Sequence, residues 1–179
     1  MKFLVIFFLD IFDYFYRLNF VKFLKKNNIN KLDVIFDIGA HKGESINFFN
    51  KYFKVKKIYS FEPSPINFAK LEKYINNKKF KPLIILENLG LGIRTEKKQL
   101  NQTIESSSST FNEINYDSNY YNKKKNLLNF FSNKKYISKI DVNIISLKTY
   151  IINNKIDKID LLKIDTEGFE FNVLSGLED

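Results

Sequence analysis

The feature that most constrains the fold is an apolar run ending in a glycine turn, Val34-Ile35-Phe36-Asp37-Ile38-Gly39. Apolar residues at both odd and even positions are typical of a strand covered on both faces. The apolar residues that follow, Ile46, Phe49 and Phe53, recur at helical spacing. A buried strand that leads directly into a helix predicts a βαβ unit, and therefore a parallel sheet.

The rest of the chain repeats this alternation. Further strands are expected at residues 57–61, 82–86, 142–145 and 159–164, and further helices at residues 147–152 and 169–174. Ser64 is expected to cap another helix, with Pro65 at its first position. Strands that alternate with helices indicate the α/β class with a mostly parallel sheet and right-handed crossovers.

Length and composition exclude several classes of protein. At 179 residues the chain has the size of about one domain of roughly 150 residues. The absence of cysteine excludes a disulfide scaffold, a cysteine-ligated zinc site and a cysteine nucleophile. Its single histidine, His41, excludes a multi-histidine metal site and disfavours a Ser-His-Asp triad.

The net charge of +9 raises the question of an anionic partner. Arginine, the preferred residue for phosphate and base contacts, occurs only at Arg17 and Arg94. Alanine occurs only at Ala40 and Ala69, while Lys, Asn, Ile and Phe are abundant, as an AT-rich genome would dictate. We therefore expect no nucleic-acid partner, with a functional basic surface as the alternative.

Residues 1–32 form an expected N-terminal amphipathic helical segment. Its first apolar run is too short for a spanning helix and lacks a signal-type cleavage site, so a cytoplasmic location is expected. We expect the helix to pack on the domain or on a second subunit, and packing on a second subunit would form an oligomer. The alternative is peripheral contact with a membrane, favoured by Lys22, Lys25 and Lys26. The apolar positions at helical spacing are Leu4, Phe7, Phe8, Ile11, Phe15, Leu18 and Val21.

The turn after the first strand is the first candidate site. Gly39 and Gly43 allow a tight turn and close approach of a ligand to the backbone. The turn departs from the dinucleotide pattern because His41 takes the central position and Glu44 opens the helix, where a carboxylate competes with a pyrophosphate. A ligand with an ammonium group and no phosphate, such as S-adenosylmethionine, suits this turn better. An ordinary strand-to-helix turn is the alternative.

Acidic residues follow two more strands. Glu62 lies about 20 residues after the glycine turn, the spacing of an acid that binds ribose hydroxyls, although a solvated loop acid is the alternative. Asp165 and Glu167 follow the strand at 159–164, where ligands of open α/β sheets bind. The alternative is that they only cap the next helix.

Residues 101–140 interrupt the alternation with a serine run and a polar, lysine-rich stretch. Such a long connection in a compact domain is usually functional or disordered. We expect a loop-rich insertion that acts as a mobile lid over an acceptor.

Four segments occur in an order that resembles the FkbM-type family of S-adenosylmethionine-dependent methyltransferases. They are DIGAHKGE (37–44), FEP (61–63), ENLGLG (87–92) and LLKIDTEGFEFNVLSG (161–176), within residues 33–176. The resemblance implies a Rossmann-like fold, S-adenosylmethionine as cofactor, and methylation of a hydroxyl group on a sugar or secondary metabolite. A small-molecule or glycan acceptor is therefore the expected partner.

The resemblance also implies roles for individual residues. The methionine part of the cofactor would be surrounded by Asp37, Gly39, His41 and Gly43. The ribose would be bound by Glu62, and the adenine would lie near Glu87 or Asn88. The acceptor would face Asp165 and Glu167. Asp165 is the first candidate for the catalytic base and His41 the second. Alternatively, Asp165 and Glu167 would hold a divalent cation. Two carboxylates are few ligands for such an ion, so no metal is expected.

The family sheet has seven strands, whereas this chain ends one helix after its fourth main strand. We therefore expect residues 33–179 to be a methyltransferase domain truncated after that strand, inactive alone and prone to aggregate through the exposed edge of 159–164. Two other functions stay open: a nicotinamide-dependent oxidoreductase, and a non-catalytic fragment or binding protein with a methyltransferase-like fold.

Overall fold

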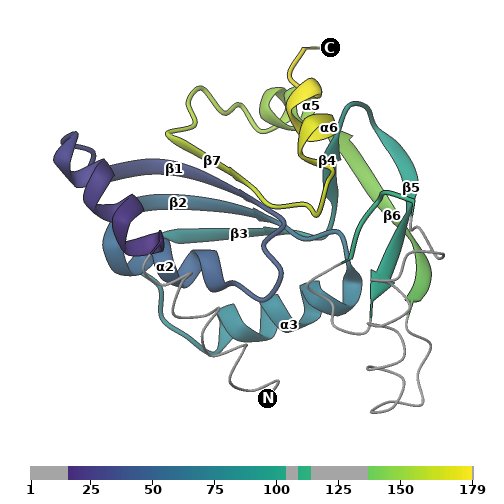
Figure 1. Cartoon of the computed structure of the whole chain (residues 1–179), viewed down its shortest axis with the longest axis horizontal. Helices are drawn as coiled ribbons and strands as arrows, with labels where there is room; N and C mark the ends of the chain where they lie inside the picture. The colour runs from purple at the N-terminus through teal and green to yellow at the C-terminus, as the bar shows by residue number, and fades with distance from the viewer. Residues whose placement is uncertain (1–15, 104–108, 114–136, 179) are drawn as a thin grey trace.

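The structure is a computed structural model, and it describes residues 16–103, 109–113 and 137–178. The strands are β1 (Lys31–Ile38), β2 (Lys54–Phe61), β3 (Leu83–Glu87), β4 (Gly90–Gly92), β5 (Glu96–Thr103), β6 (Ile137–Ser146) and β7 (Leu161–Ile164). The helices are α2 (Glu44–Tyr52), α3 (Pro65–Asn76), α5 (Leu147–Asn153) and α6 (Glu170–Ser175), and residues 16–26 are also helical (Figure 1).

A four-stranded parallel sheet is the framework of the fold. Its strand order is β3-β2-β1-β7, so β1 lies between β2 and β7. This confirms the α/β class and the mostly parallel sheet of a Rossmann-like fold. β1 begins at Lys31, earlier than the apolar pattern predicts, because Lys31 and Leu32 already pair with Lys54 and Val55 of β2.

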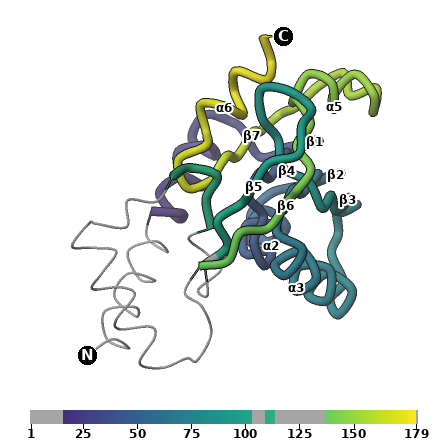
Figure 2. The backbone as a smooth tube through the Cα atoms, turned by 90° about the vertical axis from the view of Figure 1, so that its right-hand side faces the viewer, coloured from purple at the N-terminus to yellow at the C-terminus, as the bar shows by residue number. Residues whose placement is uncertain are grey.

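Both faces of this sheet are covered, as the apolar run of β1 predicts. Ile35 points into a core shared with the helical residues 16–26, α2 and α3, whereas the adjacent Phe36 points into a second core with α5 and α6. Figure 2 shows α2 and α3 on one side of the strands and α5 and α6 on the other. Because side chains of a strand alternate between its faces, a strand between two helical layers needs apolar residues at successive positions.

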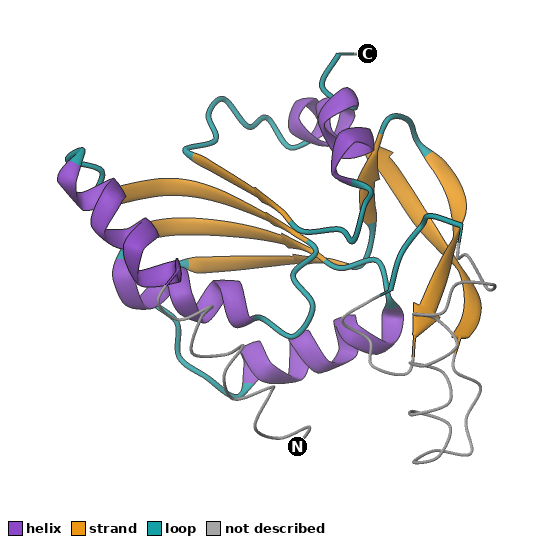
Figure 3. Cartoon of the chain, viewed as in Figure 1, coloured by secondary structure: helices purple, strands orange, loops and turns teal. Residues whose placement is uncertain are grey.

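A second sheet lies across the end of the first sheet where its strands finish (Figure 3). Its order is β4-β6-β5, with β4 parallel and β5 antiparallel to β6. The insertion expected at 101–140 therefore begins in β5 and ends in β6. Residues 104–108 and 114–136 lie outside the described residues, so the predicted lid stays a prediction.

Serine side chains begin two of the helices. Ser64 Oγ accepts a hydrogen bond from the backbone N–H of Asn67 at 3.2 Å, and Pro65 opens α3, which confirms the predicted cap. Ser146 Oγ accepts from the N–H of Thr149 at 3.1 Å at the start of α5. These caps fix where each helix leaves the strand before it.

The helical residues 16–26 pack on the first sheet through one face. Val21 and Leu24 are buried, whereas Phe20 and Phe23 are exposed. Residues 1–15 of the predicted amphipathic segment lie outside the described residues. Within the described residues, no helix combines the length and the apolar character needed to cross a bilayer.

We predict that Gly43→Ala destabilises the fold by about 2–4 kcal/mol, since it combines backbone strain with overpacking. Gly43 has a φ of +92°, and a Cβ there would lie 2.9 Å from Tyr74 Cδ1 and 3.1 Å from Leu71 Cδ1 of α3. Urea unfolding at pH 7 measures the change. Lys70→Ala on the exposed side of α3 is the control, and equal stability of the two variants would contradict the prediction.

Candidate functional site

A cavity lies at the carboxyl ends of the parallel strands, the position at which open α/β sheets bind ligands. It encloses about 450 Å³, counting its opening to solvent. The lining comes from the loops after β1, β2 and β7, from α3 and β5, and from the segment 109–113. Its residues are Gly39, His41, Glu62, Pro63, Asn67, Leu100, Ser109, Phe111, Asp165, Thr166 and Glu167.

Backbone hydrogen bonds to β2 fix the turn after β1. The carbonyl oxygen of Phe61 accepts from the N–H groups of Gly39 and Ala40, both at 3.0 Å. Gly39 has a φ of +79°, and a Cβ there would lie only 2.0 Å from the carbonyl oxygen of Asp165. Glycine is therefore required here, because the loops after β1 and β7 are in direct backbone contact.

Glu62 joins the first loop to the second. It is only 6% exposed, and its Oε2 and Oε1 accept the backbone N–H groups of His41 and Ser64, both at 2.9 Å. Burial raises the pKa of Glu62 above its usual value, although these N–H groups oppose the shift. Asn88 Nδ2 donates to the carbonyl oxygens of Glu62 and Pro63 at 2.9 and 3.3 Å, which holds the loop after β2 in place.

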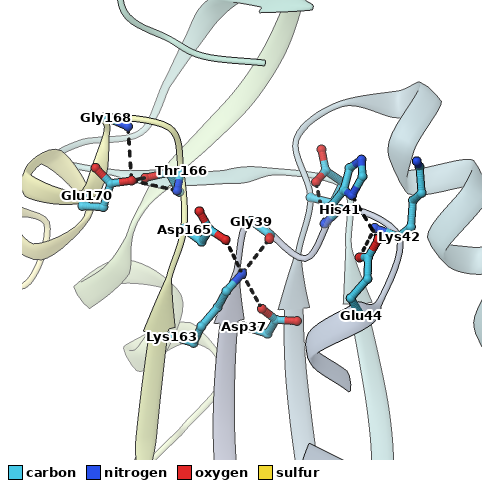
Figure 4. A network of polar contacts seen from close by, with 11 residues as sticks. Asp37, Gly39, His41, Lys42, Glu44, Lys163, Asp165, Thr166, Gly168 and Glu170 are labelled. Carbon is cyan, nitrogen blue, oxygen red and sulfur yellow. Dashed lines mark hydrogen bonds and ion pairs between the residues drawn. The ribbon is translucent and has the colours of Figure 1, made fainter. Parts of the chain in front are cut away.

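Glu170 organises the loop after β7 (Figure 4). Its Oε1 accepts from the N–H of Thr166 at 2.9 Å, from the Thr166 hydroxyl at 3.1 Å and from the N–H of Gly168 at 3.2 Å. Burial raises the pKa of Glu170, but hydrogen bonds from its own backbone N–H and from Thr166 and Gly168 outweigh burial and leave the pKa below its usual value. Within the loop Glu167 has a φ of +55°, which is rare for a residue with a side chain and typical of functional sites.

Asp37 lies beneath the cavity and does not line it. It is fully buried, with its Oδ1 3.1 Å from Lys163 Nζ. Burial raises the pKa of Asp37 above its usual value, and the nearby Lys163 ammonium offsets this only in part. Lys163 was not among the predicted site residues, although a lysine within the apolar strand expected at 159–164 was a signal.

His41 and Glu44 interact at the start of α2. His41 Nδ1 is 3.4 Å from Glu44 Oε1, and the backbone N–H of Lys42 donates to Glu44 Oε2 at 3.3 Å (Figure 4). The hydrogen bond from His41 is the main cause that lowers the pKa of Glu44 to about 2. An ionised carboxylate therefore occupies this helix start, which disfavours a bound pyrophosphate as the sequence analysis expects.

Besides Asp37, three further residues with predicted cofactor contacts do not line the cavity. Gly43 packs against α3. Glu87 Oε1 accepts a hydrogen bond from the Tyr150 hydroxyl at 2.8 Å, and burial together with this carboxylate raises the pKa of Tyr150. Asn88 supports the loop after β2. The roles of these residues toward the cofactor stay predictions.

The wall formed by residues 109–113 was not predicted. Asn101 of β5 pairs with Thr110 through two backbone hydrogen bonds, of 2.9 and 3.2 Å. The Thr110 hydroxyl donates to the carbonyl oxygen of Glu167 at 2.8 Å, and Asn112 Nδ2 donates to that of Gly168 at 3.0 Å. The segment is therefore held between β5 and the loop after β7. The only sequence signal for it was the length of the insertion.

Two apolar side chains, Phe111 of the segment 109–113 and Leu100 of β5, form one wall of the cavity. Phe111 packs on Phe169 with their ring centroids 4.8 Å apart, and it lines the cavity together with Leu100. An aromatic and an aliphatic side chain thus face the loops that carry the carboxylates. The cavity combines an apolar wall with a polar rim, as small-molecule sites commonly do.

The charge of the cavity is opposite to that of the whole chain. Among the described residues, its lining includes the carboxylates of Glu62, Asp165 and Glu167, and neither lysine nor arginine. Fixed negative charge in a cleft attracts cations and repels phosphates. Within the described part of the chain, no group of three or more side chains has the arrangement of a metal site.

A family model of the methyltransferase FkbM domain matches residues 37–179. The match begins at the carboxyl end of β1 and contains the loops after β1, β2 and β7 that line the cavity. A search of curated proteins finds no match.

We predict that Glu170→Gln lowers the stability at pH 7 by about 1 kcal/mol, because the charged acceptor of three hydrogen bonds is lost. Because the pKa of Glu170 is lowered in the folded state, its contribution to the free energy of unfolding is fully present above pH 4.5, the usual pKa of a glutamate. This contribution is lost as the pH falls through the lowered pKa of the folded state. The difference from the wild type should therefore shrink in urea unfolding at acidic pH. Glu178→Gln, at an exposed position, is the control, and a difference that is the same at every pH would contradict this prediction.

Proposed function

Because the chain belongs to the FkbM methyltransferase family, we propose that it transfers a methyl group from S-adenosylmethionine to a hydroxyl group of a small-molecule or glycan acceptor. The observation that carries this proposal is the acid-lined cavity of a basic chain, at the ends of parallel strands. S-adenosylmethionine has a sulfonium and an ammonium group and no phosphate, so its charge complements the lining.

The residues of the cavity fit this cofactor. Gly39 and His41, both in the turn after β1, line the cavity, which suits the methionine part. The Glu62 carboxylate has about four acceptor positions, so it can hold its two backbone N–H groups and still accept hydroxyl groups of a ribose. Glu44 at the start of α2 disfavours the pyrophosphate of a nicotinamide cofactor.

When bound, S-adenosylmethionine supplies an electrophilic methyl group. The chain's own residues would orient the acceptor and remove its proton, since a hydroxyl group is a weak nucleophile. Asp165 is the first candidate for this base, because it lines the cavity and its side chain is 69% exposed. His41 is the second candidate and Glu167 would orient the acceptor.

We predict that Glu62→Gln weakens binding of S-adenosylmethionine by about 1–3 kcal/mol, because charge-assisted hydrogen bonds to the ribose are lost. The ionised carboxylate is the form that accepts these bonds, and burial raises its pKa. Affinity of the wild type should therefore start to fall at a higher pH than for an ordinary glutamate as the solution is acidified. In the variant this pH dependence should disappear.

Isothermal calorimetry between pH 4 and pH 8 measures both effects, with thermal unfolding to verify that the variant is folded. Glu72→Gln on the exposed side of α3 is the matched control. A folded Glu62→Gln variant with unchanged affinity would refute the ribose assignment. Binding of a nicotinamide dinucleotide in place of S-adenosylmethionine would refute the proposed function.

We predict that Asp165→Asn lowers the turnover rate by about 10²–10⁴-fold and leaves the cofactor affinity nearly unchanged, if the carboxylate accepts the acceptor's proton. Transfer of labelled methyl to the acceptor that the wild type methylates measures the rate. Asp157→Asn, at an exposed position before β7, is the control. Lost affinity with intact turnover would instead assign Asp165 to cofactor binding.

A further inference from the structure

Lys163 extends from β7 to the junction of two loops that line the cavity (Figure 4). In the parallel pairing of β1 with β7 it lies opposite Asp37. Its Nζ is 3.1 Å from Asp37 Oδ1, 3.7 Å from Asp165 Oδ2, and donates to the carbonyl oxygen of Gly39 at 2.8 Å. One ammonium group therefore contacts the end of β1, the turn after it and the loop after β7.

The two loops also meet through their backbones. The N–H of Asp165 donates to the carbonyl oxygen of Ile38 at 3.0 Å, and the space beside Gly39 is taken by the Asp165 carbonyl group. These contacts fix the Asp165 backbone, whereas its side chain is 69% exposed. Lys163 Nζ is a cationic group that faces this carboxylate, at 3.7 Å from Asp165 Oδ2.

Lys163 and the two carboxylates near it differ in how far they are buried. Asp37 is fully buried, Lys163 has a side chain 23% exposed, and Asp165 lies at the surface of the cavity. A buried carboxylate needs a counter-ion, because an unpaired buried charge is strongly destabilising. Lys163 meets this need and has donor capacity left, since an ammonium group has three N–H donors.

We propose that Lys163 is a positioning residue that joins the turn after β1 to Asp165, and so sets the geometry between the cofactor turn and the carboxylate that faces the acceptor. This inference rests on the proposed function, which gives the two loops their roles. Lys163 acts through Gly39 and Asp165, and it does not line the cavity.

The competing explanation is that Lys163 only neutralises Asp37. The two explanations differ once the buried charge is removed. In an Asp37→Asn background there is no buried carboxylate to neutralise, so a residue that serves only as counter-ion to Asp37 becomes dispensable. A residue that positions the loops still acts there, because its contacts with Gly39 and Asp165 remain.

The test is therefore Lys163→Met, made in the wild type and in Asp37→Asn, as a double-mutant cycle. Methionine keeps an unbranched side chain in β7 and removes only the charge and the donors. Urea unfolding measures stability, calorimetry measures the affinity for S-adenosylhomocysteine, and amide NMR reports residues 39–42 and 165–167. Lys158→Met is the control, because Lys158 pairs with Asp160 at 2.6 Å before β7 and outside the cavity.

In the Asp37→Asn background we expect Lys163→Met to leave the stability nearly unchanged, to weaken S-adenosylhomocysteine binding roughly tenfold, and to shift the amide signals of both loops. Lys163→Arg should weaken binding less, because it keeps the charge and donors. Unchanged amide signals in both loops after Lys163→Met in this background would overturn the proposal. A wild type that does not bind S-adenosylhomocysteine would refute the proposed function, while the amide signals still decide the role of Lys163.

Discussion

Pairing of β1 with both β2 and β7 is the constraint on which the rest of the structure depends. The backbone bonds continue past the strand ends, where the carbonyl of Phe61 accepts from Gly39 and Ala40 and that of Ile38 accepts from Asp165. Three loops that are far apart in the sequence are thereby held at one edge of the sheet. Because Gly39 and Asp165 touch through their backbones, any change in this pairing would change the cavity directly.

Burial of carboxylates at and beneath the cavity destabilises the fold. Burial raises the pKa values of Glu62 and Asp37, so each carboxylate destabilises the folded state when it is ionised, relative to an exposed one. Backbone N–H groups offset this cost at Glu62, and Lys163 offsets it at Asp37. Acids with perturbed pKa values are typical of functional sites; Glu62 lines the cavity, and Asp37 lies beneath it at the same edge of the sheet.

The parts of the fold that the sequence predicts are those with a strong local pattern. The apolar run of β1 and the Ser64-Pro65 pair led to the parallel sheet and the start of α3. The second sheet was not predicted beyond a short strand at residues 142–145, because β5 has the polar sequence EKKQLNQT and pairs with a strand more than thirty residues away. The same limit applies to the site: Glu62 and Asp165 follow predicted strands, whereas the link through Lys163 depends on strand register.

The loops that follow predicted strands and the wall that was not predicted lie on different sides of the cavity. Under the proposed function, the cofactor contacts the loops after β1 and β2, which follow strongly patterned strands. The opposite wall contains Leu100 and Phe111, from the second sheet and the segment beside it, whose positions depend on long-range pairing. Changes in this wall can alter the shape of the cavity without disturbing the parallel sheet. Under the proposed function, the residues expected to act in the reaction and the residues of this wall would therefore come from different parts of the structure, and only the first lie in short sequence motifs.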